Sequence, residues 1–349
     1  MKRCGRCILP ETVPGISFDA EGVCNFCRSY RKEEYYPVEE LESLIASTKA
    51  RKEKYDCIVP LSGGRDSTYV LYWAKAVKDL KVLAVNYNNE FRVDQAIVNM
   101  SRACGKLGVD FVSIRSARDI VSKCVKYSIL SAVEFGQYGL CNACEYGYKS
   151  TVYRSAEKYH VPLILWGESQ FEKTADMGIN TQSERYRLKI FLKLTNMDYF
   201  IFEYLLFLQR CEFPVQNNSI YKKGNPVLLS KDTTEIRLFD YLPWDRQKIK
   251  DIIIKELGWE KPADSVSTWR TDCDIHSLGN YISYKLIGCT KDCLGYCKMI
   301  NGGQISREDA LRQEEEAINN IEHNIETLLR DKIGLSSKTV DEIISYTKN

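Results

Sequence analysis

The chain lacks several features that would assign it to a class at once. Its 349 residues carry a formal net charge of only +2, whereas a dominant nucleic-acid surface requires a strongly basic domain. No stretch approaches the roughly 18 apolar residues of a membrane-spanning helix, and the apolar segment 199–208 is too short. The opening MKRCGRCILP lacks the apolar core and cleavage site of a signal peptide. We therefore expect a cytoplasmic protein with no membrane partner, and we disfavour a nucleic-acid partner.

Cysteine, in contrast, is frequent, with 14 residues. In a cytoplasmic protein, cysteines are mostly reduced, metal-bound or catalytic. Two Cys-x-x-Cys pairs, Cys4 with Cys7 and Cys24 with Cys27, have the spacing of a four-cysteine zinc site. Four thiolates leave no open coordination position, so we expect Zn²⁺ to have a structural role here.

The order of the expected elements predicts an α/β fold with a doubly wound, Rossmann-like parallel sheet. Helical stretches separate short apolar segments of the kind that form buried parallel strands. The expected strands are 56–61, 81–87, 109–114 and 161–168, and 224–240 returns a further strand. The expected helices include 67–79, 93–107, 182–211, 245–257 and a tail that starts at Ser306 with the spacing of a capping box.

We divide the chain into four regions. Residues 1–30 form the zinc module, and 31–54 form a charged, helical connector. Residues 55–260 form the main α/β body. Residues 261–349 form a cysteine-rich, helical C-terminal region.

The sharpest motif is Ser62-Gly63-Gly64-Arg65-Asp66-Ser67, between an expected strand and an expected helix. Glycines allow a tight turn and a close approach to an anion. The following helix N-terminus offers free N–H groups and a positive dipole end to phosphate. The lysine and the spacing of a Walker A loop are both missing. The sequence therefore predicts a phosphate-binding loop of another kind, in which Asp66 holds Mg²⁺ or orients the loop.

Three further groups of residues are candidates for chemistry. Cys141 and Cys144 could hold an iron–sulfur cluster with a distant third cysteine such as Cys211, could form a transient disulfide or carry persulfide sulfur, or could simply pack. A second zinc site, a cluster, or plain packing could explain the group Cys273, His276, Cys289, Cys293 and Cys297, in which the last three are expected on one helix face. Glu168 ends the fourth strand and could bind substrate or act as a base.

The six-residue motif after a first strand resembles the PP-loop of the adenine-nucleotide alpha-hydrolase superfamily. Members bind ATP in this loop and release pyrophosphate. The resemblance implies ATP and Mg²⁺ as cofactors, with Asp66, Ser67 and Glu168 as catalytic candidates. It places the phosphates on Ser62, Gly63, Gly64, Arg65, Asp66 and Ser67, and adenine near Asn86 and Asn88.

More of the chain resembles the N-acetyl sugar amidotransferases of surface-polysaccharide biosynthesis. The strings that carry this resemblance are CGRCILPETVPGISFDAEGVCNFCRSY, DCIVPLSGGRDSTYVLYWA, VPLILWGES and INGGQISREDAL. It implies a nucleotide-activated sugar whose acetamido oxygen is adenylated and replaced by nitrogen. Because residue 2 is Lys2 and no glutaminase domain is evident, we expect a separate glutaminase subunit to supply ammonia.

Two other functions remain open. The excess of cysteines is similar to that of tRNA thiolation enzymes, so the chain could transfer sulfur to tRNA or a small molecule through a [4Fe-4S] cluster or a persulfide. It could also be a non-catalytic metal-binding adaptor, against which the intact motif argues.

Overall fold

A parallel sheet forms the centre of the chain, within the residues that the computed structural model describes: 1–32, 34–115, 121–126, 129, 140–172, 227–228, 233–262, 270–322 and 324–345. The strand order is β3-β2-β1-β4-β6-β5, and each neighbouring pair is parallel except β5 with β6. The strands are β1 (Cys57–Pro60), β2 (Val82–Asn88), β3 (Asp110–Arg115), β4 (Leu163–Trp166), β5 (Val227–Leu228) and β6 (Thr234–Arg237). The predicted parallel sheet is confirmed, and the segment expected to return a strand contains both β5 and β6.

Helices cover both faces of the sheet because its strands are apolar on both sides. These helices are α3 (Arg65–Tyr72), which continues as the π-helical turn η1 (Trp73–Val77), α4 (Asp94–Leu107), α6 (Asn142–Tyr159) and α9 (Arg246–Leu257). Val59 and Leu165 pack in one buried cluster with side chains of α3, α4 and α9. Ile58 and Ile164, which point to the opposite face, pack in another cluster with α6. Burying one such side chain contributes about 1.5–3 kcal/mol, so the alternation along each strand produces the doubly wound arrangement.

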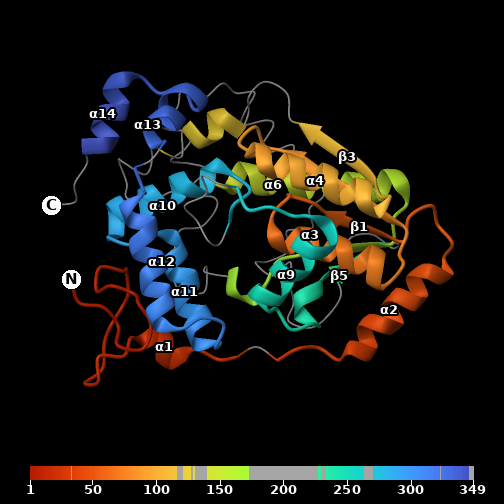
Figure 1. Cartoon of the computed structure of the whole chain (residues 1–349), viewed down its shortest axis with the longest axis horizontal. Coiled ribbons are helices and arrows are strands. Elements are labelled where there is room, and N and C mark those ends of the chain that lie inside the picture. Colours follow the sequence, from red (N-terminus) through yellow and green to blue (C-terminus); the bar gives the residue numbers. More distant parts are fainter. Residues whose placement is uncertain are drawn as a thin grey trace.

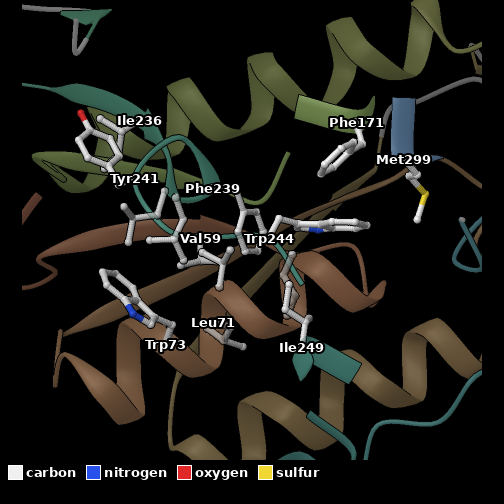
Figure 2. Close-up of a cluster of buried hydrophobic side chains, with 14 of the residues drawn as sticks. Val59, Leu71, Trp73, Phe171, Ile236, Phe239, Tyr241, Trp244, Ile249 and Met299 are labelled. Atoms are coloured by element: carbon white, nitrogen blue, oxygen red, sulfur yellow. The ribbon is translucent and has the colours of Figure 1, made fainter. Parts of the chain in front are cut away.

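Aromatic side chains fill the core beside β1 and β6, as Figure 2 shows around Trp244. The Trp244 ring packs against Phe171 at a centroid distance of 5.1 Å. Its side chain is 1% exposed. A buried indole N–H needs an acceptor, and the Trp244 N–H finds it in the Asp66 carboxylate at 3.1 Å.

The N-terminal module and the C-terminal helices pack together on one side of the sheet. The remaining described helices are α1 (Asn25–Ser29), α2 (Val38–Ala50), η2 (Gln170–Glu172), η4 (Leu238–Asp240), α10 (Asp274–Ile287), α11 (Lys291–Asn301), α12 (Arg307–Asn319), α13 (Ile325–Thr327), η5 (Leu328–Lys332) and α14 (Ser337–Ser345). Figure 1 shows the N-terminal residues (red) beside α11 and α12 (blue). Arg307 of α12 donates to the carbonyls of Cys7 (3.0 Å) and Cys4 (3.2 Å). The C-terminal helices therefore hold the N-terminal module directly.

Most of the expected helices are present where the chain is described. Ser306 caps α12 by accepting from the Asp309 N–H (2.9 Å), as its spacing indicated. Cys289 precedes α11 instead of lying on it, so the expectation that it shares a helix face with Cys293 and Cys297 is wrong. The segment 182–211, including Cys211, lies outside the described residues. None of the described helices is both long enough and apolar enough to cross a membrane.

Candidate active site

The SGGRDS loop (residues 62–67) joins the carboxyl end of β1 to the first turn of α3. Its polar groups are tied to one another. The Ser62 N–H donates to Ser67 Oγ (3.2 Å), and the Gly64 N–H donates to Ser62 Oγ (3.2 Å). The loop is thus a compact turn that ends in a helix N-terminus, where backbone N–H groups and the helix dipole favour anions.

Close backbone contacts explain the glycines in and near this loop. Gly63 has a φ of +79°, and a Cβ atom there would lie 2.2 Å from the carbonyl oxygen of Ala96 in α4. Gly167, which follows β4, would place a Cβ 3.2 Å from the Ser67 nitrogen. Any side chain at Gly63 would therefore push the loop off α4, because real Cβ atoms do not approach a carbonyl oxygen so closely.

Asp66 is oriented by its neighbours. Its carboxylate accepts two hydrogen bonds from Arg65, at 2.9 and 2.8 Å, and one from the Trp244 indole N–H at 3.1 Å. The Arg65 guanidinium also lies 5.0 Å from the Trp244 ring centroid. A carboxylate has about four acceptor positions, so Asp66 retains room for one more bond. Its geometry favours loop orientation and leaves one position for a metal ion or donor.

A cavity of about 230 Å³ adjoins the loop at the carboxyl ends of β1, β2 and β4. This is the edge at which open α/β sheets bind ligands. Polar side chains along the wall include Ser62, Arg65, Asp66, Ser67, Tyr87, Asn89, Arg92, Cys141, Cys144, Glu145, Tyr148, Glu168, Glu172, Arg270, Thr271, Asp272, Cys273 and His276. The cavity is therefore rich in charge and in groups that can exchange protons.

The segment 270–276, from the predicted C-terminal region, closes one side of this cavity. The Asp274 N–H donates to the Phe91 carbonyl (2.9 Å), which fixes the segment beside the end of β2. Asp272 forms an ion pair with Arg92 (2.6 Å), and its Cγ would lie 3.5 Å from a Cβ at Gly64. Burial alone would raise the pKa of Asp272, but Arg92 and Arg270 outweigh it and lower that pKa. Sequence reasoning missed these three charged residues because they belong to no local motif.

Two carboxylates from the end of β4 and the turn after it also line the cavity. Glu168 lines the wall as expected, and Tyr148 donates to it at 3.4 Å. Glu172, which the sequence analysis did not single out, accepts from the Ser169 N–H (3.3 Å). Burial, together with the charges of Asp66 and Glu168, raises the pKa of Glu172 to about 7, although Arg270 opposes the shift. A carboxyl group with this pKa can exchange a proton near neutral pH.

The end of β2 presents different residues from those predicted. Asn86 and Asn88 do not line the cavity, whereas Tyr87 and Asn89 do. The Asn86 amide donates to the Leu61 carbonyl (2.7 Å) and so braces β2 against β1. Asn88 accepts from the Glu90 N–H (2.9 Å). Successive strand side chains point to opposite faces, so the side chains of Asn86 and Asn88 lie off the cavity wall, and an adenine site at this strand end stays a prediction.

Three thiols, which we call the cavity thiols, lie in the cavity wall: Cys141, Cys144 and Cys273. They are half-buried, whereas every other described cysteine is buried. The Asn89 side-chain amide donates to both Cys144 and Cys273, at 3.3 Å each, so these two sulfurs are at most twice that distance apart. Burial raises the pKa of Cys144, and it raises the pKa of Cys273 to about 12. The predicted third partner, Cys211, lies outside the described residues.

The predicted second metal group is divided between two places. Cys273 and His276 line the cavity, where His276 Nε2 lies 2.7 Å from Asp292 Oδ1. Cys293 and Cys297 are buried against the N-terminal module, and Cys297 Sγ lies 3.9 Å from Cys27 Sγ. Cys289 is buried as well. The five residues are not brought together, because the start of α10 lines the cavity whereas α11 presents Cys293 and Cys297 to the N-terminal module.

The two N-terminal pairs, in contrast, converge. The Sγ atoms of Cys4, Cys7, Cys24 and Cys27, which we call the knuckle thiols, all lie within 4.8 Å of one another, and this is the one such group found among the described residues. Cys4 and Cys27 sulfurs are 4.0 Å apart, and Cys7 and Cys24 sulfurs are 3.8 Å apart. Tetrahedral zinc with bonds of 2.3 Å separates its sulfurs by about 3.8 Å. The knuckle thiols thus have the spacing of a four-thiolate metal site.

Comparisons with known proteins give remote similarities. No family model matches the chain. The uncharacterized protein MJ1599 of Methanocaldococcus jannaschii is 26% identical over 132 residues, which cover 36% of this chain and 47% of that protein. The match therefore spans about half the length of that relative.

Solved structures resemble the chain at low identity. The NMN synthetase of Francisella tularensis has 14% identity and a TM-score of 0.39, and the match covers 83% of this chain and 96% of that one. The NH3-dependent NAD synthetase of Campylobacter jejuni has 15% identity and a TM-score of 0.29, with 46% and 72% covered. The U34-tRNA thiolase NcsA of Methanococcus maripaludis, solved with its [4Fe-4S] cluster, has 13% identity and a TM-score of 0.37, with 95% and 88% covered. The function of this chain therefore rests on the geometry of its own site.

Proposed function

We propose that the chain splits ATP into AMP and pyrophosphate and uses the AMP to activate an oxygen of its substrate. The observation that carries the proposal is the SGGRDS loop, which opens from β1 into a charged cavity at the ligand edge of the sheet. The α3 N-terminus and the hydroxyls of Ser62 and Ser67 would bind the terminal phosphates. Mg²⁺, which would neutralise phosphate charge, would take the remaining acceptor position of Asp66.

The nucleophile that we propose first is ammonia, acting on the acetamido group of a nucleotide-linked sugar. The acetamido oxygen attacks the α-phosphorus of ATP, and the bond to pyrophosphate breaks. Ammonia then bonds to the activated carbon, and AMP leaves with the oxygen and the electron pair, so that NH replaces O after proton loss. The resemblance of the opening 30 residues and of three internal strings to N-acetyl sugar amidotransferases supports this choice. Ammonia would come from a separate glutaminase subunit.

The test is a mass measurement on the sugar product. The enzyme would be incubated with ATP, Mg²⁺, ammonium and a UDP-linked N-acetyl sugar. We expect AMP, pyrophosphate and a product lighter than the substrate by about one mass unit. Asp66→Ala should lower pyrophosphate release at least about 100-fold, because the loop loses its orienting carboxylate. Undiminished release from this variant would refute the role of the loop, and failure of the native protein to bind ATP would favour a non-catalytic adaptor.

Sulfur transfer is the second candidate, and the cavity thiols favour it. Cys141, Cys144 and Cys273 lie in the same cavity as the SGGRDS loop, and two of them share the Asn89 amide. The outer sulfur of a persulfide on one of these thiols could bond to the activated carbon as AMP leaves with the oxygen. A neighbouring thiol would then attack the inner, cysteine sulfur, which breaks the S–S bond, releases the thiocarbonyl product and leaves a disulfide between the two cysteines. An external thiol would have to reduce that disulfide before the next turnover. With a sulfur donor in place of ammonium, the product would then gain about 16 mass units as S replaces O. Formation of that product and none of the amidated one would replace the first proposal with the second.

We also propose that the knuckle thiols hold Zn²⁺ in a structural role. Four buried thiolates leave no open position for a reacting group. The bound ion would fix the N-terminal module against α11 and α12. Arg307 of α12 already donates hydrogen bonds to two carbonyls of this module.

A further inference from the structure

A histidine–aspartate pair lies at the edge of the cavity, outside the groups used above. His276 is in the first turn of α10 and lines the cavity wall, with 8% of its surface exposed. Its Nε2 atom lies 2.7 Å from Asp292 Oδ1. The pair joins the cavity wall to the first turn of α11, which packs behind α10.

Asp292 is held as a fixed acceptor. It is 3% exposed, and Asn280 of α10 donates to its second carboxylate oxygen at 3.1 Å. The Asp292 N–H donates back to the Asn280 side-chain oxygen at 3.3 Å. The residue also lies in the first turn of α11, where the helix dipole stabilises a negative charge. A carboxylate held in this way accepts a proton-bearing nitrogen and fixes the tautomer of the imidazole.

This tautomer determines what His276 can do. With Nε2–H directed to Asp292, the Nδ1 atom carries the lone pair, and no hydrogen bond to Nδ1 is found within the described residues. The ring thus has one nitrogen anchored in the protein and a second nitrogen able to accept a proton, on a side chain that lines the cavity. A buried carboxylate that orients an imidazole is the arrangement used in general-base catalysis.

We propose that His276 is the general base that removes a proton from the attacking nitrogen, and that Asp292 positions it. The proposal rests on the proposed function, because it requires an adenylated carbon in the cavity. As the bond from nitrogen to carbon forms, one N–H bond breaks and its proton passes to His276 Nδ1. The bond from carbon to oxygen then breaks, and AMP leaves with the electron pair. Formation of the adenylate precedes this step and does not need the base.

The test separates the two steps. Exchange of labelled pyrophosphate into ATP, in the presence of the acetamido sugar and without ammonium, measures adenylation. Product formation with ammonium measures the whole reaction. In His276→Ala we expect product formation to fall by about 10²–10⁴-fold, while exchange stays close to that of the native enzyme. Added imidazole should restore part of the lost rate, because it can occupy the space of the missing ring.

Two further variants sharpen the test. His160→Ala is the matched control, since His160 caps the C-terminus of α6 away from the cavity wall; both rates should be unchanged. Asp292→Asn should also lose product formation with exchange preserved, because the amide favours the wrong tautomer. The double variant His276→Ala/Asp292→Asn should lose no more product formation than His276→Ala alone, because the effects of residues that act as a unit are not additive.

The outcomes separate the base assignment of His276 from the proposed function. Native rates of product formation in His276→Ala, or an equal loss of exchange and product, would overturn the base assignment while the proposed function stands. A native enzyme that makes no amidated sugar would overturn both. Loss of product alone, with rescue by imidazole, supports the assignment.

Discussion

The knuckle thiols and the cavity thiols both include Cys-x-x-Cys pairs, but the two groups differ in burial and in surroundings. The knuckle thiols are 0–2% exposed and lie within 4.8 Å of one another. The cavity thiols are half-buried, and they face a space of about 230 Å³ that also contains the SGGRDS loop. A Cys-x-x-Cys pair therefore indicates that two sulfurs can meet, but the surrounding packing decides whether the site is closed and structural or open and reactive.

The packing around each group explains the difference. The knuckle thiols are covered by the C-terminal helices, and Asn301 of α11 donates to Cys27 Sγ at 3.2 Å. The cavity thiols lie at the starts of α6 and α10, beside the cavity at the carboxyl edge of the sheet. The knuckle thiols are thus enclosed by protein, whereas the cavity thiols line a space that can admit a ligand. We expect substitutions in the two regions to change stability in different directions.

The largest effect should follow the loss of one knuckle thiol. In Cys24→Ser, the four-thiolate set is incomplete, so the bound metal should be lost. We expect a decrease in the free energy of unfolding of about 4 kcal/mol or more, because metal binding is coupled to folding of the module. Zinc content per chain and urea unfolding would measure it.

The matched control for this variant is Cys104→Ser. Cys104 is a buried thiol of α4 outside the knuckles, so its substitution tests burial of a serine without loss of a metal ligand. A Cys24→Ser protein that keeps its zinc, or that is no less stable than the control, would contradict a structural metal site.

The fold could be predicted from the sequence because its signals are local. An apolar strand, a glycine turn and a helix follow one another at Ser62–Ser67, and the regular repetition of such units predicts a parallel sheet. The knuckle pairs are equally local, since each pair spans four residues. The packing of the two pairs on α11 and α12 was not predicted, because it depends on contacts between the two ends of the chain, such as Arg307 with Cys7.

The composition of the cavity could be predicted only in part. Asp66, Ser67 and Glu168 were found because they adjoin strand ends. Asp272 and His276 reach the cavity through a segment that follows the sheet by many residues, and no spacing rule connects them to the loop. Glu172 was missed because its raised pKa arises from burial among other charges, which the sequence does not display.

Replacing Glu172 should have an effect of intermediate size, and it should raise the free energy of unfolding where loss of a knuckle thiol lowers it. Its pKa is about 7 in the folded protein against an ordinary 4.5. Between these values the folded chain binds more protons than the unfolded chain, so the free energy of unfolding falls as pH rises from about 4.5 to about 7. Because the side chain is half-buried, solvent screening reduces the penalty to about 1–2 kcal/mol above pH 7. Glu172→Gln should remove it.

The measurement compares urea unfolding at pH 5 and pH 8. Relative to the native protein, Glu172→Gln should gain about 1–2 kcal/mol on going from pH 5 to pH 8. Glu315→Gln, which changes an exposed carboxylate of α12, should show no such pH-dependent gain. Equal pH dependence in the native protein and in Glu172→Gln would mean that Glu172 does not carry a raised pKa.

The smallest effect on stability should come from the cavity thiols. Cys144→Ser keeps a hydrogen-bond acceptor for Asn89 and leaves the knuckle thiols intact, so we expect the free energy of unfolding to change by less than about 1 kcal/mol and zinc content to stay constant.

The cavity thiols and the knuckle thiols should differ most in their reactivity toward an alkylating reagent. Iodoacetamide should modify Cys141, Cys144 and Cys273 before any knuckle thiol, because the half-buried cavity thiols are more accessible than the fully buried knuckle thiols. ATP should slow this modification by filling the cavity. Mass spectrometry of digested protein would identify the modified cysteines. Equal modification of both groups, or no protection by ATP, would remove the distinction between a closed site and an open one.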